Sequence, residues 1–218
     1  MRMKIAAAAC LVSVILFAYQ ADAYTQDIKA INLPAPQMQG GKPLMQALKE
    51  RKTDRAFSAK ELPLQVLSDM LWAANGINRP DSGRRTAPSA KNMQEIDIYV
   101  AKADGVYLYD AKANALTPVL AGDIRALTGK QAFVKDAPVN LIFVADFSKM
   151  SDMREADANF YAATDTGFIS ENVYLFCSSS GLATVVRAMV DKPALAKEIK
   201  LRPDQKVILT QTVGYPKD

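Results

Sequence analysis

The sequence predicts an α+β protein with one layered core. Two hydrophobic periods alternate along the chain: some segments repeat apolar residues with the spacing of a helix, and others alternate apolar and polar residues as strands do. Half of the 218 residues are hydrophobic, which suits a globular chain with a sizeable core. The sequence shows no internal repeat and no linker that would split it, so we expect a single layered domain.

Three segments have the pattern of helices. The first begins at Pro43, because proline is tolerated in the first turn, and it ends before Thr53. The second begins at Pro63 and is capped by Gly76. The third covers residues 165–180, where apolar side chains recur at helical spacing.

Four segments have the pattern of strands. Residues 96–101 alternate apolar and polar side chains, and an Asp-Gly turn returns the chain into a partner strand over residues 106–109. Residues 139–145 are almost continuously apolar, as expected for a central strand that is buried on both faces. The last strand is expected over residues 206–213.

The first 23 residues have the features of a secretory signal peptide. Arg2 and Lys4 form a basic start, and residues 5–19 form an apolar run. Residues 21–23 then give the small-x-small pattern that signal peptidase reads, so we expect cleavage after Ala23 and export to the periplasm. A membrane anchor is the alternative, but the run is shorter than the roughly 20 residues that span a bilayer.

The rest of the chain divides into an arm and a domain. Residues 24–42 contain several prolines and glycines, and we expect an extended N-terminal arm there. Residues 43–218 then form the single domain. The net charge of +4 comes without a basic stripe and interleaved aromatics, so nucleic-acid binding is not expected.

Histidine is absent from the whole sequence, which excludes several kinds of catalytic site. Ser-His-Asp hydrolysis, Cys-His catalysis and histidine-based zinc sites all require it. After cleavage of the signal peptide Cys177 stands alone, so no intrachain disulfide is expected, and we expect its thiol to be buried and inert. No metal site is expected either, and an enzyme of this composition needs a bound cofactor to carry its chemistry.

Three segments carry groups suited to ligand binding, although each also has a plain structural explanation. Residues 51–55 bring three cations and a hydroxyl to a helix end, where guanidinium groups suit a phosphate, or they form a solvated helix end. Residues 87–94 place a hydroxyl and two amides around a proline, or form an ordinary turn before a strand. Small residues within 180–187 let the backbone approach a ligand closely, or Gly181 only caps the helix.

Six short motifs occur together and in order along the chain. They are Arg-Lys-Thr-Asp-Arg at 51–55, Leu-Trp-Ala-Ala-Asn-Gly-Ile-Asn-Arg at 71–79, Pro-Ser-Ala-Lys-Asn-Met-Gln at 88–94, Gln131 followed by Ala-Pro-Val at 137–139, Gly-Leu-Ala-Thr at 181–184, and Gly-Tyr-Pro at 214–216. In this combination the chain resembles the nitroreductase family over residues 43–216. Residues 104–109 are also similar to the branch that includes thiazole/oxazole-forming dehydrogenases.

The resemblance implies a central mixed β-sheet wrapped by helices, built as an intertwined homodimer with FMN at the subunit interface. It implies that residues 51–55 bind the phosphate, the ribityl chain and the pyrimidine edge of the flavin. It also implies that the backbone near Arg187 approaches the reactive nitrogen of the flavin. It offers Lys217 as a second phosphate cation. The implied flavin-binding residues are Arg51, Lys52, Thr53, Arg55, Lys130, Gln131, Arg187, Ala188 and Lys217 from one subunit, and Pro88, Ser89, Ala90 and Asn92 from the other.

The resemblance further implies an FMN-dependent oxidoreductase that passes electrons from NAD(P)H, or from another donor, to a small organic acceptor such as a nitroaromatic or a quinone. No side chain is expected to be catalytic, because the flavin carries the chemistry. NAD(P)H is not expected outside the cytoplasm, so the expected export leaves alternatives open. The protein could be an exported flavin-binding or scavenging protein without nicotinamide-linked turnover, could take electrons from a membrane partner, or could dehydrogenate a peptide or small molecule.

Overall fold

The computed structural model describes residues 28–217. The expected signal peptide and the first residues of the expected arm therefore lie outside the described part of the chain. Within residues 28–217, no helix is both long and apolar enough to cross a membrane.

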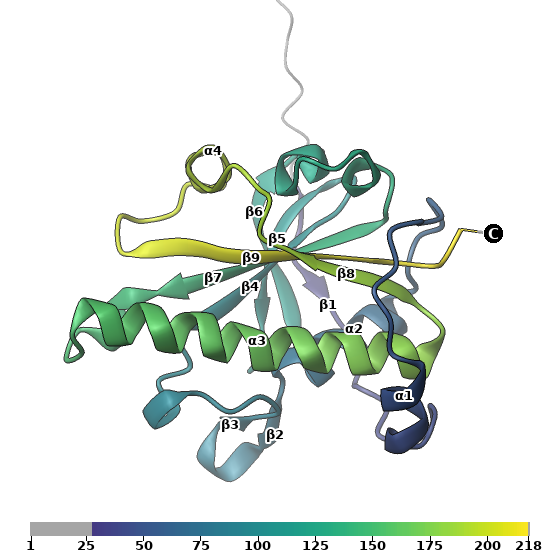
Figure 1. Ribbon diagram of the computed structural model, residues 1–218, viewed down its shortest axis with the longest axis horizontal. Coiled ribbons are helices and arrows are strands. Elements are labelled where there is room, and N and C mark those ends of the chain that lie inside the picture. Colours follow the sequence, from purple (N-terminus) through teal and green to yellow (C-terminus); the bar gives the residue numbers. More distant parts are fainter. Residues whose placement is uncertain (1–27, 218) are drawn as a thin grey trace, which may run out of the picture.

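A seven-stranded sheet forms the centre of the molecule (Figure 1). In spatial order its strands are β1 (Ile31–Asn32), β6 (Ala115–Ala121), β5 (Gly105–Asp110), β4 (Ile96–Ala101), β7 (Val139–Asp146), β9 (Gln205–Gly214) and β8 (Ala183–Arg187). The predicted α+β class and the sheet wrapped by helices are confirmed. One detail differs from the expected mixed sheet: each of these neighbouring pairs runs antiparallel.

Helices cover both faces of the sheet, and the structure has three layers (Figure 1). The helices are α1 (Leu44–Glu50), α2 (Leu64–Asn75), α3 (Glu155–Ser180) and α4 (Lys192–Glu198), and the short 3₁₀ turns include η3 (Arg125–Thr128) and η4 (Ala132–Lys135). The elements α2 and α3 cover one face, and α4 with the turns covers the other. Each face therefore has its own hydrophobic core.

Strand β7 separates these two cores, as its continuous apolar sequence predicts. All eight of its residues are buried. Leu141 and Phe143 point into the core beneath α2 and α3, and Ile142 and Val144 point into the core beneath α4. Successive side chains of a strand face opposite sides, so a strand between two helical layers is mainly apolar on both faces. The polar exceptions in β7, Asn140 and Asp146, make hydrogen bonds.

Helix α3 is longer than the sequence pattern indicates, because it begins at Glu155 rather than Asp165. Its first turns are mostly exposed and lack an apolar stripe, while Glu155 and Asp157 there complement the positive end of the helix dipole. The C-terminal boundary agrees with the prediction. Gly181 takes a left-handed conformation with φ of 70°, and its N–H donates to the carbonyl oxygen of Cys177.

Several short elements were not predicted. Strand β6 contains Pro118, which weakens the strand signal, and α4 has only seven residues. The segment between α2 and β4 includes a small hairpin of β2 (Ile77–Arg79) and β3 (Arg84–Arg85). Local patterns carry little information on such short elements, whose conformation depends on what they pack against.

The arm over residues 28–42 is mostly extended and follows the edge of the sheet onto α2. Its strand β1 pairs with β6. The carbonyl oxygen of Pro34 then accepts hydrogen bonds from Ser68 Oγ at 2.6 Å and from Asn114 Nδ2 at 2.9 Å. The arm therefore supplies the outer strand beside β6 and connects this side of the sheet to the helical layer.

Cys177 lies on the buried face of α3, as expected. Its side chain is fully buried, and burial raises the pKa of the thiol well above its ordinary value. A thiol that stays protonated is a poor nucleophile, so Cys177 acts as a small apolar side chain of the core.

The central position of β7 predicts a large effect of truncating it. Leu141→Ala should lower the free energy of unfolding by about 2–5 kcal/mol, because the cavity between helix and sheet cannot close fully. Leu64→Ala is the matched control, since Leu64 is 45% exposed at the start of α2 and should change stability by only about 0.5 kcal/mol. Urea unfolding measures both, and equal effects would contradict the assigned core.

Candidate functional site

Tyr174 of α3 joins residues 51–55 to the outer strand of the sheet. Its hydroxyl lies 3.1 Å from Thr53 Oγ1 and accepts a hydrogen bond from the backbone N–H of Val186 in β8 at 3.1 Å. The guanidinium carbon of Arg51 lies 5.3 Å from the centre of the tyrosine ring. One buried side chain thus fixes two residues that were predicted to bind the flavin.

The chain over residues 51–55 is extended, because α1 ends at Glu50. The backbone N–H of Asp54 donates to the carbonyl oxygen of Thr184 at 3.0 Å, which holds the segment against the outer edge of β8. Lys52 forms an ion pair with Asp54 at 3.1 Å, and both line a cavity of about 280 Å³ whose wall also includes Tyr174 and Thr184. Arg51 and Thr53 therefore contact Tyr174, while Lys52 is paired with Asp54.

Two further predicted segments meet at the end of β8. The backbone N–H of Lys130 donates to the carbonyl oxygen of Met189 at 3.1 Å. The side-chain amide of Gln131 lies 3.7 Å from the sulfur of the same methionine. Ala188 and Met189 are exposed directly after the strand, beside Lys130.

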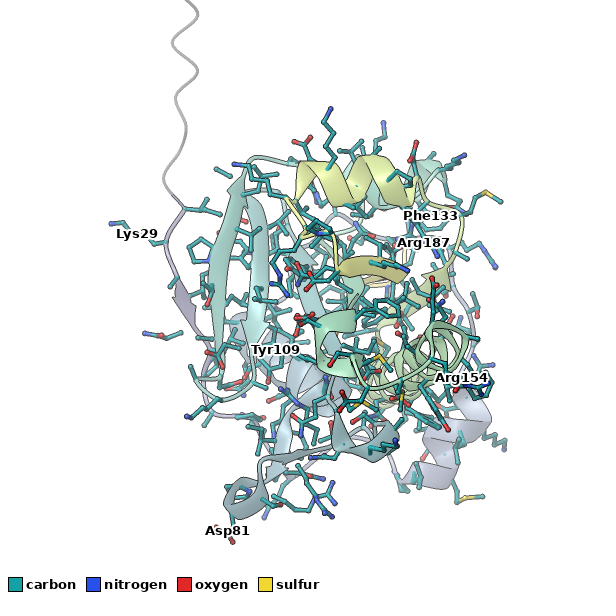
Figure 2. All side chains as sticks on the ribbon, turned by 90° about the vertical axis from the view of Figure 1, so that its left-hand side faces the viewer. Lys29, Asp81, Tyr109, Phe133, Arg154 and Arg187 are labelled. Carbon is teal, nitrogen blue, oxygen red and sulfur yellow. The ribbon has the colours of Figure 1, made fainter. Side chains whose placement is uncertain are left out.

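The side chain of Arg187 turns inward instead of toward solvent. It is 5% exposed and donates to the carbonyl oxygen of Thr128 at 2.8 Å, to Asn140 Oδ1 at 3.0 Å and to Thr212 Oγ1 at 2.7 Å. Its guanidinium carbon lies 5.8 Å from the centre of the Phe133 ring, and both side chains are labelled in Figure 2. This cation joins β8, β7, β9 and η3.

No carboxylate within residues 28–217 forms an ion pair with Arg187. Burial lowers the pKa of the guanidinium to about 10, so the group still carries its charge at neutral pH. A buried charge is costly unless polar groups replace its hydration, and here neutral oxygens do so. The result is uncompensated positive charge behind the end of β8.

Lys217 lies beside the same segment. Its backbone N–H donates to the carbonyl oxygen of Ala56 at 3.1 Å, and Phe57 forms a bridge with Pro216. Phe57 in turn packs on Phe133 with ring centres 5.4 Å apart. The structure therefore brings together, around β8, the predicted residues of segments 51–55, 130–131, 187–188 and 217.

The remaining predicted group lies elsewhere in the same chain. It consists of Pro88, Ser89, Ala90 and Asn92 in the loop before β4, where the backbone N–H of Ala90 donates to Asp165 Oδ2 at 2.8 Å. Asp165 and Tyr174 are nine residues apart on α3, which corresponds to about 13 Å along the helix. One chain therefore holds two separate halves of the predicted site.

The first half suits an anionic ligand. Among the described residues, neither Arg51, Arg55, Lys130 nor Lys217 forms an ion pair. Charged donors that lie along one strand without an ion-pair partner match the acceptor oxygens of a phosphate. The donor set therefore fits the phosphate-bearing cofactor that the sequence predicted.

Sequence reasoning missed three residues that shape this region. Tyr174 has the helical spacing of the buried face, four residues after Ser170 and three before Cys177, but its hydroxyl contacts could not be read from spacing. Phe133 and Gly129 lie in turns without a regular pattern. A methyl group on Gly129 would lie 1.7 Å from Arg187 Nη1, so only glycine leaves room for the guanidinium.

Comparison with known proteins agrees with this geometry. Residues 48–215, which include nearly all of the described domain, match the model of the nitroreductase family. The chain belongs to the nitroreductase family. Family membership makes it an oxidoreductase of the flavin type.

Two relatives support this membership over most of their length. A protein of Methanocaldococcus jannaschii, named "putative nitroreductase", is 32% identical over 152 residues, which cover 65% of this chain and 76% of the relative. The crystal structure of a "putative nitroreductase" from Ralstonia eutropha JMP134 is 41% identical, covers 88% of this chain and 91% of its own, and has a TM-score of 0.84.

More distant structures share the fold alone. The microcin synthetase complex of E. coli contains a chain that is 19% identical, with a TM-score of 0.67, covering 96% of this chain and 85% of its own. The NADPH:FMN oxidoreductase of Vibrio harveyi in complex with NAD+ is 17% identical, with a TM-score of 0.60, covering 80% and 69%. The fold thus extends to proteins with different partners.

The close approach of Gly129 to Arg187 predicts a steric effect. Gly129→Ala should lower the free energy of unfolding by about 1–3 kcal/mol, because the guanidinium or the loop must move. Gly129 has an extended backbone that alanine can adopt, so the cost is steric. Gly167→Ala is the matched control, since its new methyl group meets nothing within 4 Å and alanine favours a helix. Chemical denaturation measures both, and a fully stable Gly129→Ala protein would contradict the buried position of Arg187.

Proposed function

We propose that this protein is an FMN-dependent oxidoreductase that reduces a small organic acceptor such as a nitroaromatic or a quinone. The observation that carries the proposal is that Arg51, Arg55 and Lys217, at positions that the family motifs assign to a flavin phosphate, lie beside β8 and form no ion pair within residues 28–217. FMN, when bound, would supply the redox chemistry by taking up electrons from a donor and passing them to the acceptor.

Arg51 and Arg55 would hold the phosphate, together with Lys217 from the C-terminal segment. Arg51 is half-buried on the Tyr174 ring, and a guanidinium held in this way loses little freedom when it binds a phosphate. Thr53, held by the hydroxyl of Tyr174, would contact the ribityl chain. Lys52 would take part only after its ion pair with Asp54 opens.

The backbone of Ala188 would lie near the reactive part of the ring, with Lys130 or Gln131 at the ring edge. The buried charge of Arg187 lies directly behind this strand end. Fixed positive charge in a dry environment favours negative charge on a nearby group, and this would assist electron uptake. The absence of histidine is then no obstacle, because these groups bind and polarise without transferring protons.

A second copy of the chain would complete the site. Pro88, Ser89, Ala90 and Asn92 lie about 13 Å along α3 from the Tyr174 half, so they would reach the flavin of the other subunit. Exposed apolar side chains on α1 and α3 offer a surface for such pairing, and they are Leu44, Met45, Leu48, Phe160, Tyr161 and Phe168. An intertwined homodimer with FMN at the interface accounts for both observations.

NAD(P)H is the donor that this proposal names, since a similar fold belongs to an NADPH:FMN oxidoreductase. If the N-terminal segment directs export to the periplasm, a membrane partner would replace NAD(P)H as the donor. The second candidate function is flavin binding or scavenging without nicotinamide-linked turnover. The cations beside β8 favour flavin binding in either case.

The direct test is to purify the protein and record its absorbance before and after adding FMN. We expect flavin absorbance with a 1:1 ratio of FMN to chain, loss of that absorbance on anaerobic addition of NADH or NADPH, and a dimer in solution. A protein that binds no FMN would overturn the proposal. Bound FMN that no nicotinamide can reduce would favour the membrane donor or the scavenging function.

Removing one phosphate cation tests the assigned site. Arg51→Ala should weaken FMN binding about 10- to 100-fold, because a charge-assisted hydrogen bond is lost. Arg154→Ala is the matched control, since this exposed arginine pairs with Asp157 at the other end of α3 and should leave affinity unchanged. Fluorescence titration with FMN measures both, and equal affinities of the two variants would show that Arg51 does not hold the phosphate.

A further inference from the structure

Two buried carboxyl groups lie beneath the loop that carries Pro88–Asn92. Glu95 is fully buried at the start of β4, and Asp165 is 3% exposed on α3. Both carboxyl oxygens of Glu95 accept no hydrogen bond from residues 28–217, and Asp165 is the acidic group that interacts with this carboxyl. Asp165 Oδ2 already accepts the backbone N–H of Ala90.

The loop above this pair has an unusual backbone. Lys91, Asn92 and Gln94 have φ values of 51°, 57° and 50°, although none of them is glycine. Non-glycine residues rarely adopt this left-handed region, and three of them within four positions persist only where contacts hold them there. The loop conformation therefore depends on its anchors.

Several hydrogen bonds hold the loop. The backbone N–H of Gln94 donates to Ser89 Oγ at 3.0 Å, Arg85 Nε donates to Gln94 Oε1 at 2.8 Å, and Gln94 Nε2 donates to the carbonyl oxygen of Gly83 at 3.1 Å. Within residues 28–217, the hydrogen bond from Ala90 to Asp165 is the one that links the loop to α3. Among these anchors, only the acceptor Asp165 lies beside another acidic group.

The charges around Glu95 favour its neutral form. Burial, followed by the nearby carboxylate of Asp165, raises the pKa of Glu95 to about 7. Lys149 is the nearest opposing cation, but its ammonium group already donates to Asp97 at 3.2 Å and to the carbonyl oxygen of Gln94. The guanidinium of Arg85 donates instead to Gln94 Oε1 and to the carbonyl oxygen of Asn75.

We propose that Glu95 and Asp165 share one proton, and that this protonated pair holds the loop over residues 88–94 in the conformation that presents Pro88–Asn92 to a flavin. The proton resides on Glu95, whose O–H faces the carboxylate of Asp165, and Asp165 in turn accepts the N–H of Ala90. Glu95 and Asp165 are positioning residues, since neither reaches the flavin. The role of the loop in flavin binding rests on the proposed function, whereas the shared proton does not.

Loss of the proton has a defined consequence. Two adjacent buried carboxylates cannot both stay ionised without cost, so Glu95 would move toward solvent and the loop would open. The folded-state pKa is raised above its ordinary 4.5, so the closed loop is favoured at low pH and weakens as pH rises through about 7. Loop opening should increase about tenfold between about pH 6 and about pH 8.5.

Hydrogen exchange of the flavin-free protein tests the shared proton directly. After correction for the intrinsic exchange rate, protection of the peptide that contains Ala90 should fall about tenfold over this pH range in the wild-type protein. The near-isosteric Glu95→Gln mimics the protonated form and should stay protected at both pH values. Unchanged protection in the wild-type protein, or an equal fall in Glu95→Gln, would overturn the proposal.

Two further variants make the test robust. Asp165→Asn removes the like charge but keeps an acceptor for Ala90, so its pH dependence should be smaller than that of the wild-type protein. Glu198→Gln removes an exposed carboxylate on α4 and should retain the full wild-type pH dependence. An Asp165→Asn protein with the full tenfold change would show that Asp165 does not share the proton.

FMN titration at the same two pH values then tests the link to the flavin. We expect affinity to fall more steeply with pH in the wild-type protein than in Glu95→Gln. Parallel pH dependences of FMN affinity, together with pH-dependent protection in the wild-type protein alone, would overturn the link but not the shared proton. A protein that binds no FMN at either pH would refute the proposed function, and the exchange result would stand independently.

Discussion

The buried guanidinium of Arg187 is the constraint on which this region of the fold depends. It lies at the end of the outer strand and reaches back to oxygens of η3, β7 and β9, so one side chain sets the position of three separate segments. Gly129 must leave room for it, and Phe133 packs on it. The turn that carries Lys130 and Gln131 is thereby fixed beside the end of β8.

Helix α3 carries one organising residue for each of the two predicted halves of the site. Its C-terminal half carries Tyr174, which organises the cationic segment, and its middle carries Asp165, which organises the loop before β4. The two regions are rigidly connected because both belong to one continuous helix that packs on the sheet. The proposed homodimer would use this connection, since its flavin would contact unlike halves from the two chains.

Much of this arrangement could be predicted from the sequence, and the rest depended on contacts between distant residues. Continuous apolar residues predicted β7, and an Asp-Gly turn predicted the β4–β5 hairpin, because these signals are local. The motif at 51–55 identified the cationic segment. Spacing could not show that Arg187 turns inward or that Tyr174 joins two segments, since each depends on partners far along the chain.

The segment that carries Arg51 and Thr53 also protects the edge of the sheet. Strand β8 ends the sheet, and its outward backbone groups would otherwise be free to pair with another chain. The backbone N–H of Asp54 donates to the carbonyl oxygen of Thr184, and the hydroxyl oxygen of Tyr174 accepts the backbone N–H of Val186. Detachment of this segment would expose a strand edge, so the segment that carries the predicted phosphate cations also limits pairing of this edge with another chain.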